Sequence, residues 1–324
     1  MTKAIRIHDF GGPEVMRWEE VALGHPGPGE ALVRHTAVGL NFIDVYHRSG
    51  LYPLPLPATL GMEGAGVVEA VGDGVGEVRI GDRVAYANPP PGSYAERRLM
   101  PAHRLVVLPK DIDDRQAAAM MLQGMTAQYL LRRTYRVEAG ETILVHAAAG
   151  GVGLMMCQWA KHLGVTVIGT VGSDEKAELA RAHGCAHAIV YSRENFVDRV
   201  RELTEGAMVP VVYDSVGKDT FMGSLDCLRP LGMLVSFGQS SGKVPPLDTG
   251  LLAAKGSLFL TRPSLMTYTA KREDLVASAA ELFDMVERGF VRVEVNQTYP
   301  LAEAAQAHRD LEGRRTTGST VLLP

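Results

Sequence analysis

The pattern of hydrophobic and polar residues divides the chain into two parts. From Thr2 to about Leu122, short runs with strand character are separated by turns rich in Gly and Pro, and the runs include Ala31–Val38, Gly64–Val71 and Asp82–Ala85. Short strands separated by turn residues are typical of a compact antiparallel barrel or sandwich. We therefore predict a mainly β domain at the start of the chain.

Beyond about Gln123, apolar runs with strand character alternate with amphipathic segments. After a helical stretch through Tyr129–Arg133, the predicted strands are Thr142–Ala147, Val165–Thr170, Ala188–Tyr191, Val209–Asp214, Met233–Gly238 and Ser257–Thr261. Segments between them end at Gly164, Gly184 and Gly206, where glycine can adopt the left-handed conformation that follows a helix. Strict alternation of strands and helices predicts a doubly wound parallel sheet.

The last part of the chain is too short to bury a core of its own. Its pattern predicts a helix over roughly Glu273–Arg288, then a short helix and the strand Thr320–Leu323. We expect this tail to rejoin the first domain. Residues 1–125 and 263–324 would then form one split domain around a nucleotide-binding domain at residues 126–262.

Composition narrows the class of protein. A chain of 324 residues is long enough for two cores. With 46% hydrophobic residues, 22% charged residues, a net charge of −4 and no block of like charges, nothing favours nucleic acid or an anionic membrane as a partner. Residues 1–10 alternate as in a strand, unlike a signal peptide, and no apolar stretch reaches the length of a membrane span. The 3 cysteines are far apart, which suits reduced thiols, so we expect a cytoplasmic enzyme.

The most informative motif is the small-residue stretch Ala147–Gly153, which lies between an apolar strand and the predicted helix Leu154–Leu163. Small residues let the backbone approach a pyrophosphate, and the amide groups at a helix start face its negative charge. Ala148 stands where the usual G-x-G-x-x-G pattern has its first glycine. This context predicts a dinucleotide site, with Gly150, Gly151, Val152 and Gly153 as binding residues.

The end of the second predicted strand distinguishes the two nicotinamide cofactors. An NAD site places a carboxylate there to accept hydrogen bonds from the ribose, and a carboxylate would repel a 2′-phosphate. Here Gly172 leaves room, Ser173 can donate a hydrogen bond, and Lys176 adds a positive charge one helical turn onward. Tyr191, at the end of the third strand, can close the adenine side. These residues favour NADPH as the cofactor.

Two alternatives remain open at this position. Ser173 can merely cap the following helix, with Lys176 a solvated surface charge. Asp174 and Glu175 follow directly, and either carboxylate can turn toward the ribose and favour NAD.

The loop after the fifth predicted strand lies on the carboxyl edge of the sheet, where ligands bind in such folds. We expect its backbone to hold the nicotinamide, although an ordinary loop is a fair alternative. The residues concerned are Phe237, Gly238, Gln239 and Ser240.

Taken together, the motifs resemble a known family. The whole chain resembles the zinc-free quinone oxidoreductases (zeta-crystallin type) of the medium-chain dehydrogenase/reductase superfamily. The motifs that carry the resemblance are Gly11–Val15, Asn41–Asp44, Arg48–Pro53, Gly81–Val84, Ala147–Gly153 and Val212–Gly217. The resemblance implies a mainly β, GroES-like catalytic domain split around a Rossmann insert, NADPH-dependent reduction of quinones, and a homodimer paired through the edge strand 257–261.

The resemblance also implies further cofactor contacts outside the glycine loop. These positions are Phe42, Ile43, Asp44, Thr126, Tyr129, Val216 and Arg314. A helix-surface tyrosine and a solvated arginine are the plainer interpretations of Tyr129 and Arg314.

Metal-dependent relatives hold a catalytic zinc with a cysteine and a histidine where this chain has Asn41 and Met62. An amide and a thioether cannot replace a thiolate and an imidazole as zinc ligands. A structural zinc lobe needs four closely spaced cysteines, and the chain has 3 in all. We therefore predict that the chain has no metal site.

A quinone accepts hydride without a Lewis acid, so the protein needs mainly to orient the acceptor and to donate hydrogen bonds to its oxygen. The candidate donors are Asn41, Tyr46 and Tyr52, although both tyrosines can instead be packing residues on a Pro-rich loop.

Two other functions remain open. A reductase of activated C=C bonds, in 2-alkenals or enoyl thioesters, would use the same hydride chemistry. An enoyl thioester enzyme should also have a cluster of basic residues to bind a phosphorylated carrier, and the sequence shows no such cluster. A non-enzymatic crystallin-like or RNA-binding role is the other, and the net charge of −4 disfavours RNA.

Overall fold

The computed structural model describes residues 1–87 and 89–324. The chain forms two compact units. The first comprises Met1–Met125, Thr269–Glu287 and Val293–Pro324, and the second comprises Thr126–Tyr268 and Arg288–Arg292. The boundary expected at residue 262 therefore falls inside the second unit. Among the described residues, no helix is long and apolar enough to cross a membrane.

The second unit contains the predicted parallel sheet. Its strands are β9 (Thr142–Val145), β10 (Thr166–Val171), β11 (His187–Val190), β12 (Val209–Asp214), β13 (Leu228–Ser236) and β14 (Phe259–Thr261). They lie in the order β11-β10-β9-β12-β13-β14, and every neighbouring pair is parallel. This order reverses between β9 and β12, as in dinucleotide-binding folds. The predicted doubly wound fold is confirmed, and β14 lies at an edge of the sheet.

Helices connect these strands. They are α3 (Gly151–His162), α4 (Asp174–Ala182), α5 (Phe196–Leu203), α6 (Phe221–Asp226), α7 (Gly250–Ala254) and α8 (Leu265–Tyr268). Gly164, Gly184 and Gly206 have φ values of +75°, +96° and +85°, which confirms the predicted left-handed helix ends. Several strand boundaries differ from the predicted ones: β9 ends at Val145 and β14 begins at Phe259. The largest difference is in β13, which begins at Leu228, before the expected Met233, because its first half continues through the exposed residues 229–231.

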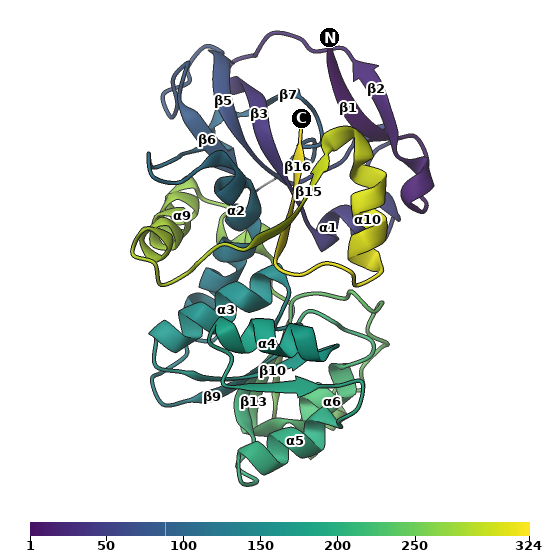
Figure 1. Cartoon of the computed structure of the whole chain (residues 1–324), viewed down its shortest axis with the longest axis vertical. Coiled ribbons are helices and arrows are strands. Elements are labelled where there is room, and N and C mark those ends of the chain that lie inside the picture. The colour runs from purple at the N-terminus through teal and green to yellow at the C-terminus, as the bar shows by residue number, and fades with distance from the viewer. Residues whose placement is uncertain (88) are drawn as a thin grey trace. The chain divides into compact units, whose positions relative to one another are not determined.

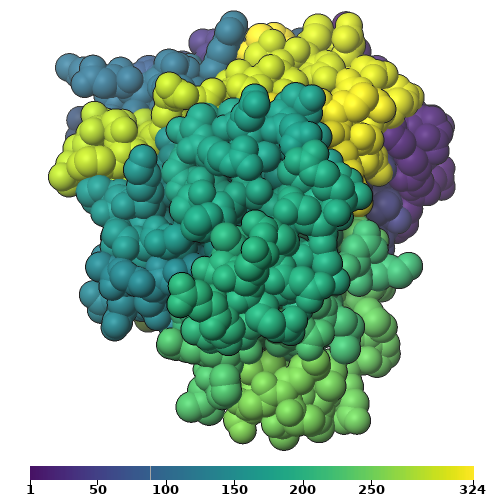
Figure 2. Space-filling view, turned by 60° about the horizontal axis from the view of Figure 1, so that its bottom comes forward, coloured from purple at the N-terminus to yellow at the C-terminus, as the bar shows by residue number. Residues whose placement is uncertain are grey.

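The first unit is mainly β, as predicted (Figure 1). Its strands are β1 (Thr2–Ile7), β2 (Arg17–Val21), β3 (Glu30–Leu40), β4 (Ala58–Thr59), β5 (Glu63–Val71), β6 (Arg83–Tyr86), β7 (Arg97–Pro101), β8 (Val106–Val107), β15 (Val295–Pro300) and β16 (Ser319–Leu323). One sheet has the order β2-β1-β4, and the other has the order β15-β16-β3-β5-β6-β8, with β7 also pairing with β3. The C-terminal strand β16 pairs antiparallel with β3. Residues from the two ends of the chain consequently share one surface (Figure 2).

Helix α1 (Phe42–Arg48) was not predicted from the sequence, which suggested only a Pro-rich loop as an alternative environment for Tyr46 and Tyr52. The helix is only seven residues long and carries few strong helix formers. Its sequence signal is the capping box of Asn41 and Asp44, in which the Asp44 carboxylate accepts a hydrogen bond from the Asn41 backbone N–H at 2.9 Å.

Helix α2 (Asp114–Tyr129) begins well before Gln123, where we expected the change of texture. Its residues Ala117–Met121 are all fully buried, so the helix has no polar stripe to show the helical period. A π-helix (Leu130–Thr134) continues it. The other helices of the first unit are α9 (Arg272–Glu287) and α10 (Ala304–Glu312), with short 3-10 turns at Pro13–Val15, Ala102–Arg104 and Leu301–Glu303.

Candidate functional site

The glycine loop of the second unit leads from β9 into α3. Ala147 adopts a left-handed conformation with φ of +53°, and the following Ala148 N–H donates to the Thr170 carbonyl at 3.1 Å. Gly150 is the extended N-cap residue, and no side chain caps the helix at this position. Helix α3 starts at Gly151, earlier than the expected Leu154.

Gly153 lies in the first turn of α3 and packs directly against the loop. A Cβ atom at this position would meet the Ala147 carbonyl oxygen and would lie 2.7 Å from the Ala148 Cα. Because only glycine allows this approach, the first amide groups of α3 remain next to the loop backbone. A helix start with uncapped amides beside small residues is a cradle that fits a pyrophosphate.

The departure from the usual glycine pattern is accommodated on the neighbouring strand. Ala148 is fully buried, and a Cβ atom at Gly169 of β10 would lie 2.6 Å from the Ala148 Cβ. The absence of a side chain at Gly169 therefore leaves room for the alanine methyl group. The pairing joins positions on two different strands, and the loop motif alone does not reveal it.

The end of β10 brings together the residues expected near the adenosine ribose. A Cβ atom at Gly172 would lie 2.9 Å from the Tyr191 hydroxyl oxygen, so the tyrosine lies over a position without a side chain. Ser173 is the N-cap of α4, and its Oγ accepts a hydrogen bond from the Lys176 N–H at 3.3 Å. The capping interpretation of Ser173 is thus correct for its acceptor side.

Two carboxylates follow Ser173, and both are engaged. Asp174 forms a bidentate ion pair with Arg193, with distances of 2.5 and 2.6 Å between the guanidinium nitrogens and the carboxylate oxygens. This contact lowers the pKa of Asp174. A hydrogen bond from Ser173 likewise lowers the pKa of Glu175. Arg193 was not identified from the sequence, because it lies 19 residues from Asp174.

A second loop layer forms at the ends of β12 and β13. The Asp214 carboxylate accepts hydrogen bonds from the Val216 and Gly217 N–H groups at 2.8 and 3.0 Å. The Phe237 N–H donates to the Asp214 carbonyl at 2.8 Å. A Cβ atom at Gly238 would lie 2.5 Å from the Ser215 carbonyl oxygen. The loops that carry Val216 and Phe237–Ser240, both expected at the nicotinamide, are therefore packed together.

Arg262, which follows β14, holds this second loop from the other side. One guanidinium nitrogen donates to the Ser236 carbonyl at 2.9 Å and to the Gly238 carbonyl at 2.8 Å. Sequence reasoning did not identify this residue, because nothing local links it to the loop.

In the first unit, the candidate catalytic residue Asn41 belongs to a buried chain of hydrogen bonds. Its Nδ2 donates to the Glu63 carboxylate at 2.6 Å, and its Oδ1 accepts from the Gln123 Nε2 at 3.2 Å. The Gln123 Oε1 in turn accepts from the Ser319 hydroxyl at 2.6 Å. Because Gln123 presents its Nε2 to Asn41 and its Oε1 to Ser319, the Asn41 Oδ1 must be the acceptor toward Gln123, and the Asn41 Nδ2 therefore faces Glu63. The other members of this series of hydrogen bonds were not identified from the sequence, and they are Glu63, Gln123 and Ser319.

The carboxyl groups of Asp44 and Glu63 are both fully buried in this region. Burial raises the pKa of Asp44 to about 7 and the pKa of Glu63 to about 8, although hydrogen bonds to Asn41 oppose both shifts. Because the Asp44 side chain points into the interior, a cofactor contact at this position would have to use its backbone. Phe42 and Ile43 are partly exposed.

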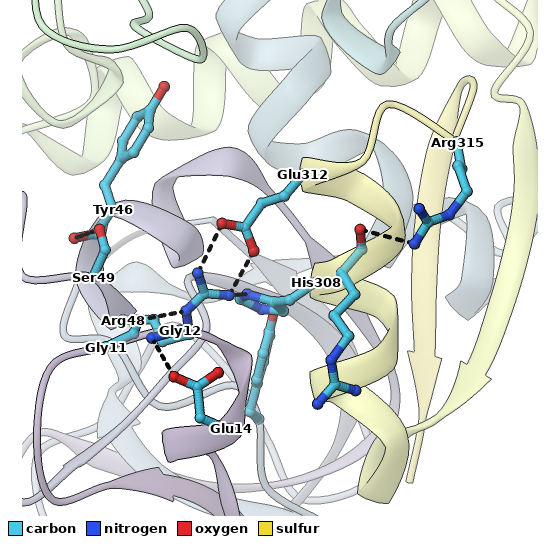
Figure 3. Close-up of polar contacts among 11 residues, drawn as sticks. Gly11, Gly12, Glu14, Tyr46, Arg48, Ser49, His308, Glu312 and Arg315 are labelled. Carbon is cyan, nitrogen blue, oxygen red and sulfur yellow. Dashed lines mark hydrogen bonds and ion pairs between the residues drawn. The ribbon is translucent and has the colours of Figure 1, made fainter.

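The other end of α1 is held by the buried side chain of Arg48 (Figure 3). Its two terminal nitrogens each donate to a Glu312 carboxylate oxygen at 2.8 Å, and its Nε donates to the Gly11 carbonyl at 3.1 Å. The same guanidinium lies 3.0 Å from the His308 Nδ1. The motif residues Gly11 and Arg48, far apart in sequence, are thus in contact.

These contacts form a polarised chain through the unit. A guanidinium can only donate, so the His308 Nδ1 accepts from Arg48 and its proton resides on Nε2. The His308 Nε2 lies 3.1 Å from the Tyr94 hydroxyl, which donates to Asp44 at 3.0 Å. Burial, and then the charge of Arg48, lower the pKa of His308 to about 3, which keeps the ring neutral.

The aromatic candidates lie on and beside α1. The Tyr46 and Tyr52 rings pack edge to face with centroids 5.2 Å apart, and the Tyr52 N–H donates to the Tyr46 carbonyl. Tyr46 is 8% exposed. Its side chain points away from the Arg48 contacts in Figure 3.

The remaining predicted contacts occupy different environments. Tyr129 is buried and stacks on Tyr268 with centroids 4.4 Å apart, and burial raises the pKa of its hydroxyl. Thr126 is also buried. Arg314 is exposed in a left-handed conformation with φ of +57°. Within residues 1–87 and 89–324, no group of three or more His, Cys, Asp or Glu side chains is arranged to hold a metal ion.

Comparisons with known proteins cover most of the chain. Residues 27–110 match the family described as alcohol dehydrogenase GroES-like domain, and residues 151–283 match the family described as zinc-binding dehydrogenase. The chain is 58% identical over 325 residues to a quinone oxidoreductase of Pseudomonas aeruginosa, with 100% of both chains covered. It is 50% identical over 332 residues to a 2-haloacrylate reductase of a Burkholderia species, with 100% of this chain and 99% of the relative covered.

A solved structure agrees with these relatives. The quinone oxidoreductase of Escherichia coli, crystallised in complex with NADPH, superposes with a TM-score of 0.98 at 48% identity. The match covers 99% of this chain and 100% of that one.

Proposed function

Because the chain belongs to the quinone oxidoreductases of the medium-chain dehydrogenase/reductase superfamily, we propose that it reduces a quinone with NADPH. The observation that carries this proposal is the cradle at Gly150–Gly153. Its helix start is uncapped, and Gly153 brings the amides against the loop. Relatives named quinone oxidoreductase match the chain over its full length.

The second unit binds the nucleotide. Gly150, Gly151, Val152 and Gly153 hold the pyrophosphate, while Gly172, Ser173, Lys176 and Tyr191 hold the phosphorylated ribose. Val216, Phe237, Gly238, Gln239 and Ser240 line the nicotinamide, with Thr126 and Tyr129 as further contacts. When bound, NADPH supplies a hydride from C4 of its nicotinamide ring.

The first unit binds the acceptor. The Asn41 amide keeps one N–H beyond the one that it donates to Glu63, and this N–H donates to the quinone oxygen. Tyr46 and Tyr52 supply hydroxyl donors beside it. Phe42, Ile43 and Arg314 are cofactor contacts. Because the reduced quinone spreads its negative charge over a ring, these donors and a fixed orientation replace a Lewis acid.

A second candidate substrate is an activated C=C bond. It is favoured by the 50% identity to a 2-haloacrylate reductase. Such an acceptor also takes a hydride without metal assistance and needs a donor at its carbonyl or carboxylate oxygen.

A substrate panel separates these two functions. Stopped-flow NADPH oxidation is followed with simple quinones, 2-alkenals and 2-haloacrylate, and NADH serves as the control donor. We expect quinones to give the highest kcat/KM, with NADPH preferred. Faster turnover of the alkenal or the haloacrylate would make the C=C bond the substrate.

The candidate hydroxyl donors are tested by replacing both Tyr46 and Tyr52 with Phe. The edge-to-face packing of the rings is retained, so the fold should persist. We expect kcat/KM for a simple quinone to fall by about 100-fold, as for loss of a positioned donor, with the dissociation constant for NADPH unchanged. Unchanged turnover would eliminate the two tyrosines as catalytic residues.

The role of Lys176 is tested by Lys176→Ala. Loss of a charge beside a 2′-phosphate should raise KM for NADPH by about 10-fold and leave KM for NADH nearly unchanged. Equal effects on the two cofactors would refute the assignment.

The proposed assembly is a homodimer paired through β14. This edge strand pairs with β13 on one side, and its apolar residues Phe259 and Leu260 are 56% and 39% exposed. Phe259→Lys should convert the dimer to a monomer in sedimentation experiments at micromolar concentration. A monomeric wild-type mass would contradict the proposal.

The cytoplasm is the location that we propose. Three free, buried cysteines suit its reducing conditions, and they are Cys157, Cys185 and Cys227.

A further inference from the structure

The start of α4 presents a carboxylate where an NAD site would use one. Asp174 follows the N-cap Ser173 directly and lies about 20 residues beyond Gly153, which is the spacing of the acidic residue that binds the ribose hydroxyls in NAD-binding folds. Its side chain is 63% exposed, so burial does not keep it from a ligand. An unpaired carboxylate there would repel a 2′-phosphate.

Arg193 pairs with both oxygens of that carboxylate. Its two terminal nitrogens contact the two Asp174 oxygens at 2.5 and 2.6 Å. Arg193 lies in the turn after β11, two residues beyond Tyr191, whose hydroxyl lies over Gly172 at the end of β10. The turn that carries Tyr191 thus also carries the cation that binds the acidic residue.

The neighbouring carboxylate is engaged as well, because the Ser173 hydroxyl donates to Glu175. The two acidic residues that would favour NAD are therefore held by different partners.

We propose that Arg193 is a specificity-determining residue: by pairing with Asp174 it withdraws the carboxylate from the ribose and lets the site accept a phosphorylated dinucleotide. An exposed ion pair adds little to stability, so breaking it should leave the fold intact and its effect on the ligand can be measured separately. The inference rests on the proposed use of NADPH and adds the residue that makes an acidic helix start compatible with it.

The test measures binding without turnover. Calorimetry gives the dissociation constants of 2′,5′-ADP and 5′-AMP, which differ only in the 2′-phosphate, for the wild type, Arg193→Ala, Asp174→Ala and the double variant. Arg201→Ala is the matched control. It removes a similar exposed ion pair, with Asp198 on α5, in which the exposed fractions are 56% and 68% against 57% and 63% for Arg193 and Asp174.

We expect Arg193→Ala to reduce the preference for 2′,5′-ADP over 5′-AMP by about 10-fold, since the unpaired Asp174 carboxylate then faces the phosphate. The double variant should recover most of this loss, and Arg201→Ala should change nothing. A preference within twofold of the wild type in Arg193→Ala would overturn the proposal. So would a loss that the double variant does not recover, because Arg193 would then act on the phosphate itself.

Failure of the NADPH assignment gives a different result. A wild type that binds 2′,5′-ADP no more tightly than 5′-AMP refutes that assignment. In that case the role of Arg193 is tested by the affinity for 5′-AMP alone. Arg193→Ala should bind 5′-AMP more tightly than the wild type does. The double variant should not. An unchanged affinity for 5′-AMP would then overturn the role of Arg193 as well.

Discussion

The glycine loop of the second unit and helix α1 of the first unit follow buried strands in the same way, but they are held by opposite means. The loop after β9 is shaped by missing side chains, at Gly153 and at Gly169 opposite Ala148. Helix α1 after β3 is held by side chains that reach across the unit, through Asn41 at one end and Arg48 at the other. A ligand that is bound by backbone amides needs close approach, whereas an acceptor needs oriented donors.

The largest effect is expected at Gly153, where a missing side chain shapes the loop. Gly153→Val places atoms where the Ala147 carbonyl and the Ala148 backbone lie, so the loop or the start of α3 must move. We expect a loss of about 3 kcal/mol in the free energy of unfolding and a rise of at least about 100-fold in the dissociation constant for NADPH, equivalent to the loss of several amide contacts. Calorimetry and urea unfolding measure the two effects.

Gly76→Val is the control for this substitution, because a Cβ atom at Gly76 meets nothing within 4 Å. It should leave NADPH binding unchanged. Tight NADPH binding by Gly153→Val would show that the cradle is not where the nucleotide binds.

The side-chain contacts that hold α1 are tested at Arg48. Arg48→Met keeps much of the buried volume but leaves Glu312, His308 and the Gly11 carbonyl without their donor. Because Glu312 is 34% exposed and can be hydrated, we expect a loss of about 2 kcal/mol. Urea unfolding should show this loss, with kcat for a quinone reduced more than the affinity for NADPH.

Arg315→Met is the matched control. Arg315 pairs with Asp310, which lies on α10 as Glu312 does, but Arg315 is 59% exposed. Its loss should cost less than about 1 kcal/mol. Equal losses for the two variants would mean that Arg48 does not hold α1.

The third test concerns the pH dependence that buried Glu63 gives to stability. Burial raises the folded pKa of Glu63 to about 8 from a usual 4.5, so the folded state keeps a proton that the unfolded state has released. Its contribution to stability is therefore fully present below about pH 4.5 and is lost as the pH rises through about 8. In Glu63→Gln this loss should disappear, so the free energy of unfolding should fall less between pH 5 and pH 8 than in the wild type.

Glu69→Gln is the control, because pairing with Arg97 lowers the pKa of that partly exposed carboxylate. Its contribution is lost only as the pH falls below the usual range of a glutamate, so it is constant between pH 5 and pH 8. An equal pH dependence in the wild type and Glu63→Gln would show that Glu63 titrates normally.

The same contrast explains what could be predicted from the sequence. The glycine loop, the helix-ending glycines and the parallel sheet depend on residues that are near each other in the chain, and their pattern is visible directly. Asn41 was identified only by the absence of a zinc ligand. Its partners Glu63 and Gln123 lie 22 and 82 residues away, and nothing local connects them.

Helix α1 also could not be predicted from the local sequence pattern. Its capping box is a local signal, but its seven residues are held mainly by tertiary contacts. Arg48 meets His308 and Glu312, which are 260 and 264 residues away, so the pattern of the segment gives little indication of a helix. Arg193 and Arg262 were missed for the same reason: each acts on a loop that another part of the chain provides.

The most direct test of the central claim is a crystal structure of the NADPH complex, grown from protein that was dialysed against a chelator and still oxidises NADPH with a quinone. The account predicts the pyrophosphate against the amides of Gly150–Gly153 and the 2′-phosphate beside Ser173 and Lys176. A nucleotide bound elsewhere, or activity that is lost on dialysis and restored by zinc, would contradict it.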